Sequence, residues 1–184
     1  QAGEIALAYF RPGERTSAAV SYKNGGSPVT EADLAVDRFL NEEMRHLAPQ
    51  AGWLSEETTD HPSRLERATV FIIDPIDGTA SFINGVPLFG TLIGLWRRDA
   101  SGATGYLGCI NHPALNERWI GGAGEPTTCN GRAVRSRACA ALSEATVYLT
   151  GDDMLKGEEV GRFAALAKRA ARKRVGGTDC YHYA

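Results

Sequence analysis

VFIIDPIDGT, the sequence of residues 70–79, joins an apolar run directly to two carboxylates. The β-branched and aromatic residues 70–73 predict a strand that is covered on both faces, and the proline after Asp74 is expected to end it because proline donates no ladder hydrogen bond. That proline also fixes one φ angle, and Gly78 permits a backbone geometry that other residues resist. We therefore expect Asp77 to turn back toward Asp74.

Two carboxylates held this close repel each other and need a cation. Oxygen-rich sites suit Mg²⁺ or Mn²⁺ rather than zinc, which prefers His and Cys. A plainer interpretation is a strand end with an Asp-Pro turn, in which Asp77 caps a helix that starts near Thr79. The complete Asp-x-x-Asp-Gly-Thr pattern favours the metal site, and the free N–H groups of Gly78 and Thr79 at a helix start would suit a phosphate.

The composition is that of one globular unit with a substantial core. The chain has 184 residues, of which 43% are hydrophobic and 23% charged, and its net charge of -2 gives no reason to expect nucleic acid or a membrane as partner. No apolar run approaches the ~20 residues of a membrane helix. The four cysteines form no C-x-x-C pair, so we expect reduced thiols in a cytoplasmic protein that acts on a small molecule.

Hydrophobic periodicity predicts alternating helices and strands. Helices are expected at residues 1–10, at 30–48 with Thr30 as N-cap, and from about Glu158 to Arg174. The last of these would bury its apolar stripe and place its basic residues at the helix end, where they complement the dipole. Strands are expected within 52–58 and at 89–96, 105–111, 117–121 and 145–149, with a hairpin turn at residues 130–131.

Glu56 and Glu57 follow the short apolar segment at 52–54. Adjacent residues on a strand point to opposite faces, so only one of the two acids would face a given neighbour. Alone, the pair is typical of an exposed acidic loop. It gains importance beside the acids of residues 74–77.

Three motifs together resemble the inositol monophosphatase superfamily: residues 74–79, the preceding Ser55-Glu56-Glu57, and residues 29–33. They stand in the family's order and at similar separations, and the similarity extends through the whole chain. Residues 82–95 and 176–183 most resemble the histidinol-phosphate phosphatase branch. The resemblance implies a layered αβαβα sandwich with an N-terminal α+β half at residues 1–145, which would carry the site, and the beginning of a C-terminal α/β half at residues 146–184.

The resemblance also implies the metal ligands. Glu56 would bind the first metal, Asp74 would bridge two metals, the Ile76 carbonyl would complete the first site, and Asp77 would serve the second. The family carries a further ligand in a later Trp-Asp motif, and no tryptophan of this chain precedes an aspartate. We therefore expect this sequence to be a piece of a longer protein, with an incomplete second half, a weakened second metal site and little activity.

Catalytic roles follow from the same resemblance. Asp33 would pair with Thr79 to activate the attacking water, Glu57 would support the metal ligands as a further acid, and Gly78 and Thr79 would bind the phosphate. Asp179 would pair with the amine of the substrate, although capping the next helix is an equally good interpretation.

The resulting expectation is an Mg²⁺-dependent phosphoric monoester hydrolase that acts through two or three ions, with Mn²⁺ as a substitute. Its expected substrate is L-histidinol phosphate, which would place it in histidine biosynthesis as a cytoplasmic homodimer. An inositol or related sugar-alcohol phosphate is the alternative substrate. An inactive metal-binding fragment is the alternative outside enzymes, and a phosphate-binding module without metal would need cations near Gly78, where the sequence supplies none nearby.

Overall fold

The computed structural model describes residues 1–99 and 102–184. Its α-helices are α1 Ala2–Tyr9, α2 Glu31–Leu47, α3 Thr79–Ile83, α4 Glu158–Arg169 and α5 Asp179–Tyr183. Its strands are β1 Val20–Tyr22, β2 Pro28–Thr30, β3 Gly52–Ser55, β4 Thr69–Asp77, β5 Gly90–Asp99, β6 Gly102–His112, β7 Glu117–Gly122, β8 Glu125–Cys129, β9 Arg132–Ala133, β10 Thr146–Leu149 and β11 Arg172–Val175. Short 3₁₀ turns lie at Pro62–Glu66, Pro113–Leu115, Leu142–Glu144 and Asp152–Met154.

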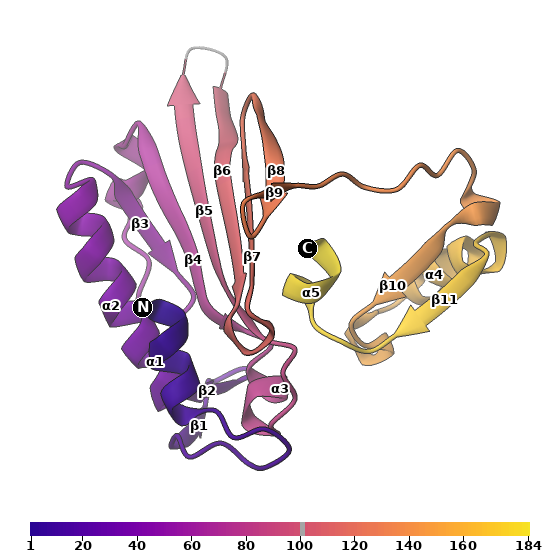
Figure 1. Cartoon of the computed structure of the whole chain (residues 1–184), viewed down its shortest axis with the longest axis horizontal. Coiled ribbons are helices and arrows are strands. Elements are labelled where there is room, and N and C mark those ends of the chain that lie inside the picture. Colours follow the sequence, from indigo (N-terminus) through magenta and orange to yellow (C-terminus); the bar gives the residue numbers. More distant parts are fainter. Residues whose placement is uncertain (100–101) are drawn as a thin grey trace.

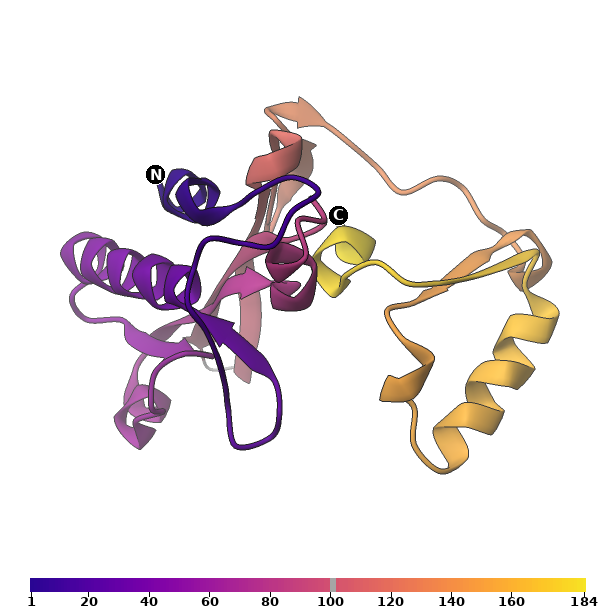
Figure 2. The same cartoon turned by 90° about the horizontal axis from the view of Figure 1, so that it is seen from below.

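A seven-stranded sheet in the order β3-β4-β5-β6-β7-β8-β9 forms the centre of the molecule (Figure 1). β3 runs parallel to β4, and the remaining neighbours pair antiparallel. Helices α1 and α2 lie together on one face of this sheet (Figure 2). The predicted mixed α/β class is therefore confirmed, and so is the hairpin turn, in which Asn130 and Gly131 both have positive φ angles of 49° and 78°.

Strand β4 does not end at the Asp-Pro step, contrary to the sequence prediction. It continues through Pro75 to Asp77, and its register against β5 shifts between Asp74 and Asp77. From Asp74 to Asp77 the chain advances three residues while its partners in β5 advance two, which defines a β-bulge. Pro75 therefore lies outside the regular ladder, where its missing N–H is not needed. The Thr91 hydroxyl donates to the Pro75 carbonyl at 2.9 Å and closes the irregular segment.

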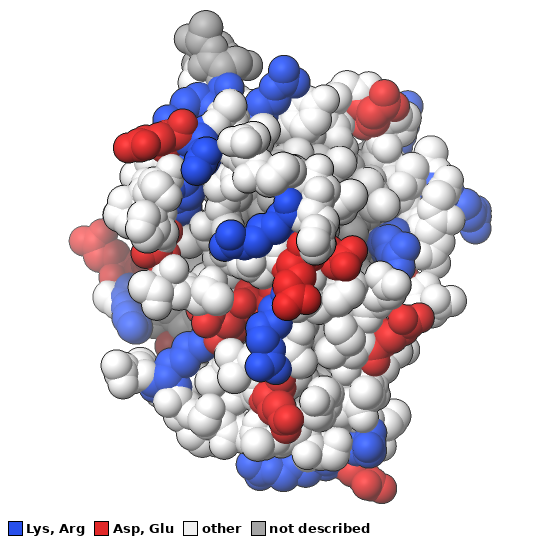
Figure 3. Space-filling model, turned by 90° about the vertical axis from the view of Figure 1, so that its left-hand side faces the viewer, with Lys and Arg blue, Asp and Glu red and all other residues white. Residues whose placement is uncertain are grey.

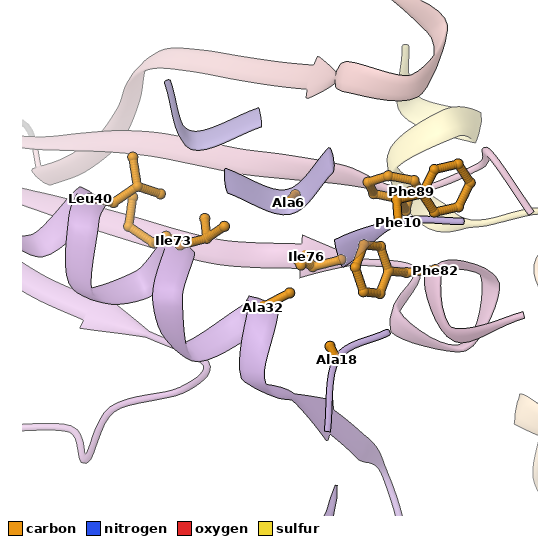
Figure 4. Close-up of a cluster of buried hydrophobic side chains, with 10 residues drawn as sticks. Ala6, Phe10, Ala18, Ala32, Leu40, Ile73, Ile76, Phe82 and Phe89 are labelled. Carbon is orange, nitrogen blue, oxygen red and sulfur yellow. The ribbon is translucent and has the colours of Figure 1, made fainter. Parts of the chain in front are cut away.

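The core lies between α1, α2, α3 and the sheet (Figure 4). Three aromatic rings meet there, with centroid separations of 4.8 Å for Phe10 and Phe89, 5.0 Å for Phe82 and Phe89, and 5.9 Å for Phe10 and Phe82. Such tilted pairs add to the stabilisation by burial. Because Phe82 belongs to α3, this cluster fixes the short helix that begins directly after Asp77 and Gly78.

Strands β10 and β11 form a separate parallel pair joined by α4, and α5 lies between this unit and the large sheet (Figures 1 and 2). The predicted helix from Glu158 to Arg174 was too long, because α4 ends at Arg169 and the basic residues 172–174 belong to β11. Pairing with β10 overrides their helical propensity. Burial of the helix was also overestimated, since no residue of α4 is buried in this structure. The division at residue 145 stays a prediction.

Figure 3 shows the side of the molecule on which α2 lies, and acidic and basic side chains are interspersed there. None of the helices that the structure describes combines the length and apolar character needed to cross a membrane.

Candidate metal and phosphate site

The parallel pairing of β3 with β4 brings two acidic segments together. Ser55, the last residue of β3, pairs with Ile73, so Glu56 lies beside Asp74, which is still within β4. The Glu56 N–H donates to the Ile73 carbonyl at 3.2 Å and continues the ladder by one residue. The sequence prediction that Glu56 and Asp74 serve one site has this geometric basis.

Asp33 and Thr79 meet although they lie on different helices. Thr30 caps α2, and the Asp33 carboxylate closes a capping box by accepting from the Thr30 N–H at 2.8 Å. The other Asp33 oxygen is 3.4 Å from the Thr79 hydroxyl, which lies closer, at 3.0 Å, to the Ile76 carbonyl. A hydroxyl has one proton, so Thr79 donates to one of these two acceptors at a time.

Gly78 holds the turn between β4 and α3 in the left-handed region, with φ 81° and ψ 34°. A Cβ at this position would lie 2.9 Å from the Leu88 carbonyl oxygen and 2.7 Å from the Thr178 side chain. Both the φ angle and the close approach therefore require glycine. The backbone turn that presents the Thr79 N–H depends on this residue.

Lys23, in the hairpin between β1 and β2, provides a cation that the sequence analysis missed. Its ammonium group contacts Glu56 Oε1 at 2.8 Å and Glu57 Oε1 at 2.9 Å. The Glu57 side chain is only 5% exposed, so the hairpin closes over an acid that is almost buried. Burial alone would lower the pKa of Lys23, but the bonds to both glutamates outweigh it and raise that pKa.

Helix α5 reaches the site from the far end of the chain. The Cys180 N–H donates to Asp77 Oδ2 at 2.8 Å, and Oδ1 of that carboxylate does not take part in this bond. Asp179 is the first residue of α5 and not its cap, and its carboxylate accepts from the Thr150 hydroxyl. Asp179 is thus half-buried between α5 and the end of β10, one residue from the atom that contacts Asp77.

The electrostatics of the site show an excess of negative charge. Burial, followed by the nearby charges of Glu56 and Asp77, raises the pKa of Asp74 to about 8. Burial likewise raises the pKa of Asp33 to about 6, with the Thr30 hydrogen bonds opposing it and the Glu57 charge adding to it. These acids would be easier to ionise beside a further cation.

The donor chemistry fits a hard divalent cation, but the side chains are not yet turned toward one point. Within residues 1–99 and 102–184, no three His, Cys, Asp or Glu side chains converge to hold a metal ion. Glu56 is directed to Lys23, and one oxygen of Asp77 to Cys180. The surplus carboxylates around Asp74 nevertheless match the oxygen ligands that Mg²⁺ prefers. Binding would require Glu56 to exchange its ammonium partner for the ion.

Sequence reasoning also overlooked Asp37, which is buried and accepts a hydrogen bond from Ser55. One signal could have found it: Asp33 and Asp37 are four residues apart on one predicted helix and therefore share a face. The position of Lys23 carried no comparable signal, because its role depends on how the hairpin folds back over β3.

The chain combines a mixed α/β framework, acids on and directly after the neighbouring strands β4 and β3, and a glycine turn into α3. Residues 1–182 match the inositol monophosphatase family, and the chain belongs to that family.

Individual relatives agree with this assignment. The chain is 35% identical over 190 residues to the chloroplastic bifunctional phosphatase IMPL2 of Arabidopsis thaliana, covering 99% of this chain and 50% of that protein. It is 40% identical over 155 residues to a histidinol-phosphatase of Chlorobaculum parvum, covering 84% and 56%. The solved inositol monophosphatase of Zymomonas mobilis superimposes with a TM-score of 0.78 at 31% identity, covering 99% and 66%. The chain thus spans about half the length of these curated relatives.

Proposed function

We propose that this chain carries the catalytic half of an Mg²⁺-dependent phosphatase that hydrolyses a small phosphate monoester, with L-histidinol phosphate as its substrate. The observation that carries the proposal is the position of the Thr79 hydroxyl, between the Asp33 carboxylate and the Ile76 carbonyl at the end of β4. A hydroxyl with two competing acceptors can shift its hydrogen bond from one acceptor to the other when metal ions and substrate bind.

Metal binding is assigned to Glu56, Asp74, the Ile76 carbonyl and Asp77. Two or three bound ions, Mg²⁺ or Mn²⁺ in its place, would lower the pKa of a water and neutralise the leaving alkoxide. An ion on the Ile76 carbonyl would make that oxygen a poorer acceptor, so the Thr79 hydroxyl would donate to Asp33 instead. Asp33 then holds the hydroxyl so that its oxygen accepts from the attacking water.

Phosphate binding is assigned to the N–H groups of Gly78 and Thr79, which start α3 and have no helical partner there. Glu57 keeps Lys23 close to Glu56 by sharing its ammonium group. Asp179 is assigned to the amine of the substrate, since a carboxylate can form a charge-assisted bond to an amine and Asp179 adjoins Cys180, whose N–H contacts Asp77. Asp179 would take this role if the substrate's amine replaced the Thr150 hydroxyl as the donor to its carboxylate.

The choice of histidinol phosphate is supported by the relative from Chlorobaculum parvum, at 40% identity. An inositol phosphate is the alternative, supported by the inositol-1-monophosphatase of Rhizobium meliloti at 32% identity over 136 residues. A cytoplasmic homodimer acting in histidine biosynthesis remains part of the proposal.

Phosphate release from L-histidinol phosphate and from inositol 1-phosphate, each with Mg²⁺ and with EDTA, tests the function. We expect slow Mg²⁺-dependent release that is faster from histidinol phosphate than from inositol 1-phosphate and is abolished by Asp74→Asn. A preference for inositol 1-phosphate would overturn the substrate assignment, and turnover that survives Asp74→Asn would overturn the two-metal account.

A binding protein without turnover is the competing class of function. Its support is the absence of an Asp after any tryptophan of this chain. Saturable Mn²⁺ binding without phosphate release from either substrate would favour it over the enzyme.

A further inference from the structure

Asp37 is a buried carboxylate next to the proposed site, and no role has been assigned to it so far. It lies one helical turn after Asp33 on the same face of α2 and is 3% exposed. Its Oδ1 accepts a hydrogen bond from the hydroxyl of Ser55, the last residue of β3. This contact joins α2 to the strand that delivers Glu56 and Glu57.

The Ser55 hydroxyl makes two bonds with different directions. It donates its proton to Asp37, and its oxygen accepts from the Glu57 N–H at 3.3 Å. Since a hydroxyl has one proton and two lone pairs, the acceptor chosen for the proton decides where the lone pairs point. Asp37 therefore aims the Ser55 oxygen at the Glu57 amide.

The result is a turn whose backbone is held at consecutive residues. β4 holds the Glu56 N–H through the Ile73 carbonyl, and Ser55 holds the Glu57 N–H. Adjacent residues on an extended strand would point to opposite sides, yet both of these carboxylates reach the Lys23 ammonium group. The turn that Ser55 stabilises departs from the extended conformation, so the side chains of Glu56 and Glu57 can both reach Lys23.

We propose that Asp37 is a positioning residue that acts through the Ser55 hydroxyl to hold the Glu56-Glu57 turn, and thereby sets the affinity of the site for a divalent cation. The inference rests on the proposed function, because it takes Glu56 as a metal ligand. Residues that orient ligands typically change metal affinity by about 10–100-fold when they are removed.

The test compares Ser55→Ala, Ser55→Thr, Asp37→Asn and the double variant Asp37→Asn/Ser55→Ala in this 184-residue chain. Mn²⁺ affinity is measured by electron paramagnetic resonance, and exchange of the Glu57 amide by NMR without metal. We expect Ser55→Ala to weaken Mn²⁺ binding about tenfold and to accelerate exchange of the Glu57 amide. Ser55→Thr keeps the hydroxyl and should therefore keep the Mn²⁺ affinity and the exchange rate of the unmodified chain. The double variant should match Ser55→Ala alone, because Asp37 acts through that hydroxyl.

Thr16 offers a matched control whose hydroxyl contacts none of the proposed metal ligands. Its buried hydroxyl also donates to an oxygen, the backbone carbonyl of Tyr9 at 2.9 Å, and accepts from an N–H two residues later, that of Ala18 at 3.2 Å. Thr16→Val should lower stability without changing Mn²⁺ affinity. An equal loss of affinity in Thr16→Val would show that destabilisation alone explains the effect and would overturn the positioning role.

The remaining outcomes separate this inference from the proposed function. Failure of the unmodified chain to bind Mn²⁺ would overturn both the metal site and the affinity claim, and it is recognised before any variant is made. Additive losses in the double variant, or unchanged Glu57 exchange in Ser55→Ala, would overturn the positioning role even though the metal site stands. If Ser55→Ala does not fold, the isosteric Asp37→Asn carries the same two measurements.

Discussion

Replacement of Asp74 by Asn should stabilise the metal-free protein at neutral pH, although it removes a central residue of the proposed site. Burial and the charges of Glu56 and Asp77 raise the pKa of Asp74 from 3.8 to about 8. A raised pKa in the folded state means that the native protein binds the proton more tightly than the unfolded chain. The loss of stability caused by ionising Asp74 is absent below the pKa of this group in the unfolded chain. It grows as the pH rises toward the pKa of the group in the folded protein.

The size of the effect follows from that interval. Each pH unit between the unfolded pKa and the working pH contributes about 1.4 kcal/mol, which sets an upper value of about 4 kcal/mol at pH 7. The neighbouring acids share this repulsion, so we expect Asp74→Asn to gain about 2 kcal/mol in the free energy of unfolding at pH 7. The gain should be smaller by about 1 kcal/mol or more at pH 5.

Urea denaturation followed by tryptophan fluorescence in EDTA measures this gain at both pH values. Asp60, whose pKa is lowered by its hydrogen bonds to Arg64, provides the control, and Asp60→Asn should stabilise the protein at neither pH. Added Mg²⁺ should stabilise the unmodified chain and leave Asp74→Asn unchanged. A gain that does not depend on pH, or a loss of stability at pH 7, would refute the assignment of charge repulsion to Asp74.

Further expectations concern the residues around this acid. Lys23→Met should destabilise the metal-free chain by about 1–3 kcal/mol, because it leaves the buried Glu57 without its cation; Mn²⁺ should recover most of that loss in a thermal melt, and a loss that Mn²⁺ does not reduce would contradict competition for the acids. Thr79→Val should lower Mg²⁺-dependent phosphate release about 100-fold, whereas Thr79→Ser should retain most of it; equal rates in both variants would exclude the hydroxyl from the reaction. Gly78→Ala should lower the free energy of unfolding by about 2 kcal/mol or more, because its φ is 81° and the Leu88 carbonyl lies in the way; unchanged urea midpoints would argue against this turn. Iodoacetamide should label the exposed Cys139 before the buried Cys180, whose pKa burial raises to about 12; mass spectrometry after tryptic digestion would reveal the reverse order.

Local chemistry explains which parts of the fold could be predicted from the sequence. The start of α2 followed from Thr30 and the acids after it, since a capping box involves residues only three positions apart. The Asn-Gly turn before β9 followed from the ease with which both residues adopt positive φ angles. Each of these features is determined within a few residues.

The errors came from contacts between distant segments. β4 passes through Pro75 because a bulge removes the need for a ladder N–H there and the Thr91 hydroxyl satisfies the Pro75 carbonyl, and neither is visible in residues 70–79 alone. Residues 172–174 are helical by composition and extended in the structure because β10 is available to pair with them.

For the site, the motifs indicated which acids belong together, and the structure brings Asp33 to Thr79 and Glu56 beside Asp74. Their metal and catalytic roles stay predictions. The partners Lys23 and Ser55 could not be inferred, because each depends on how a hairpin or strand end packs against residues more than 15 positions away.

The bond from the Cys180 N–H to Asp77 has a consequence for the order in which the protein folds. Its two residues are 103 positions apart in the sequence, so closing this contact requires a large loop to be ordered. During synthesis, β3, β4 and α3 can assemble while α5 is still inside the ribosome, because contacts of low sequence separation form first. Asp77 would remain accessible to solvent and to cations throughout that interval. Metal that is captured cotranslationally would therefore meet a more open acidic centre than the one in which α5 already contacts Asp77.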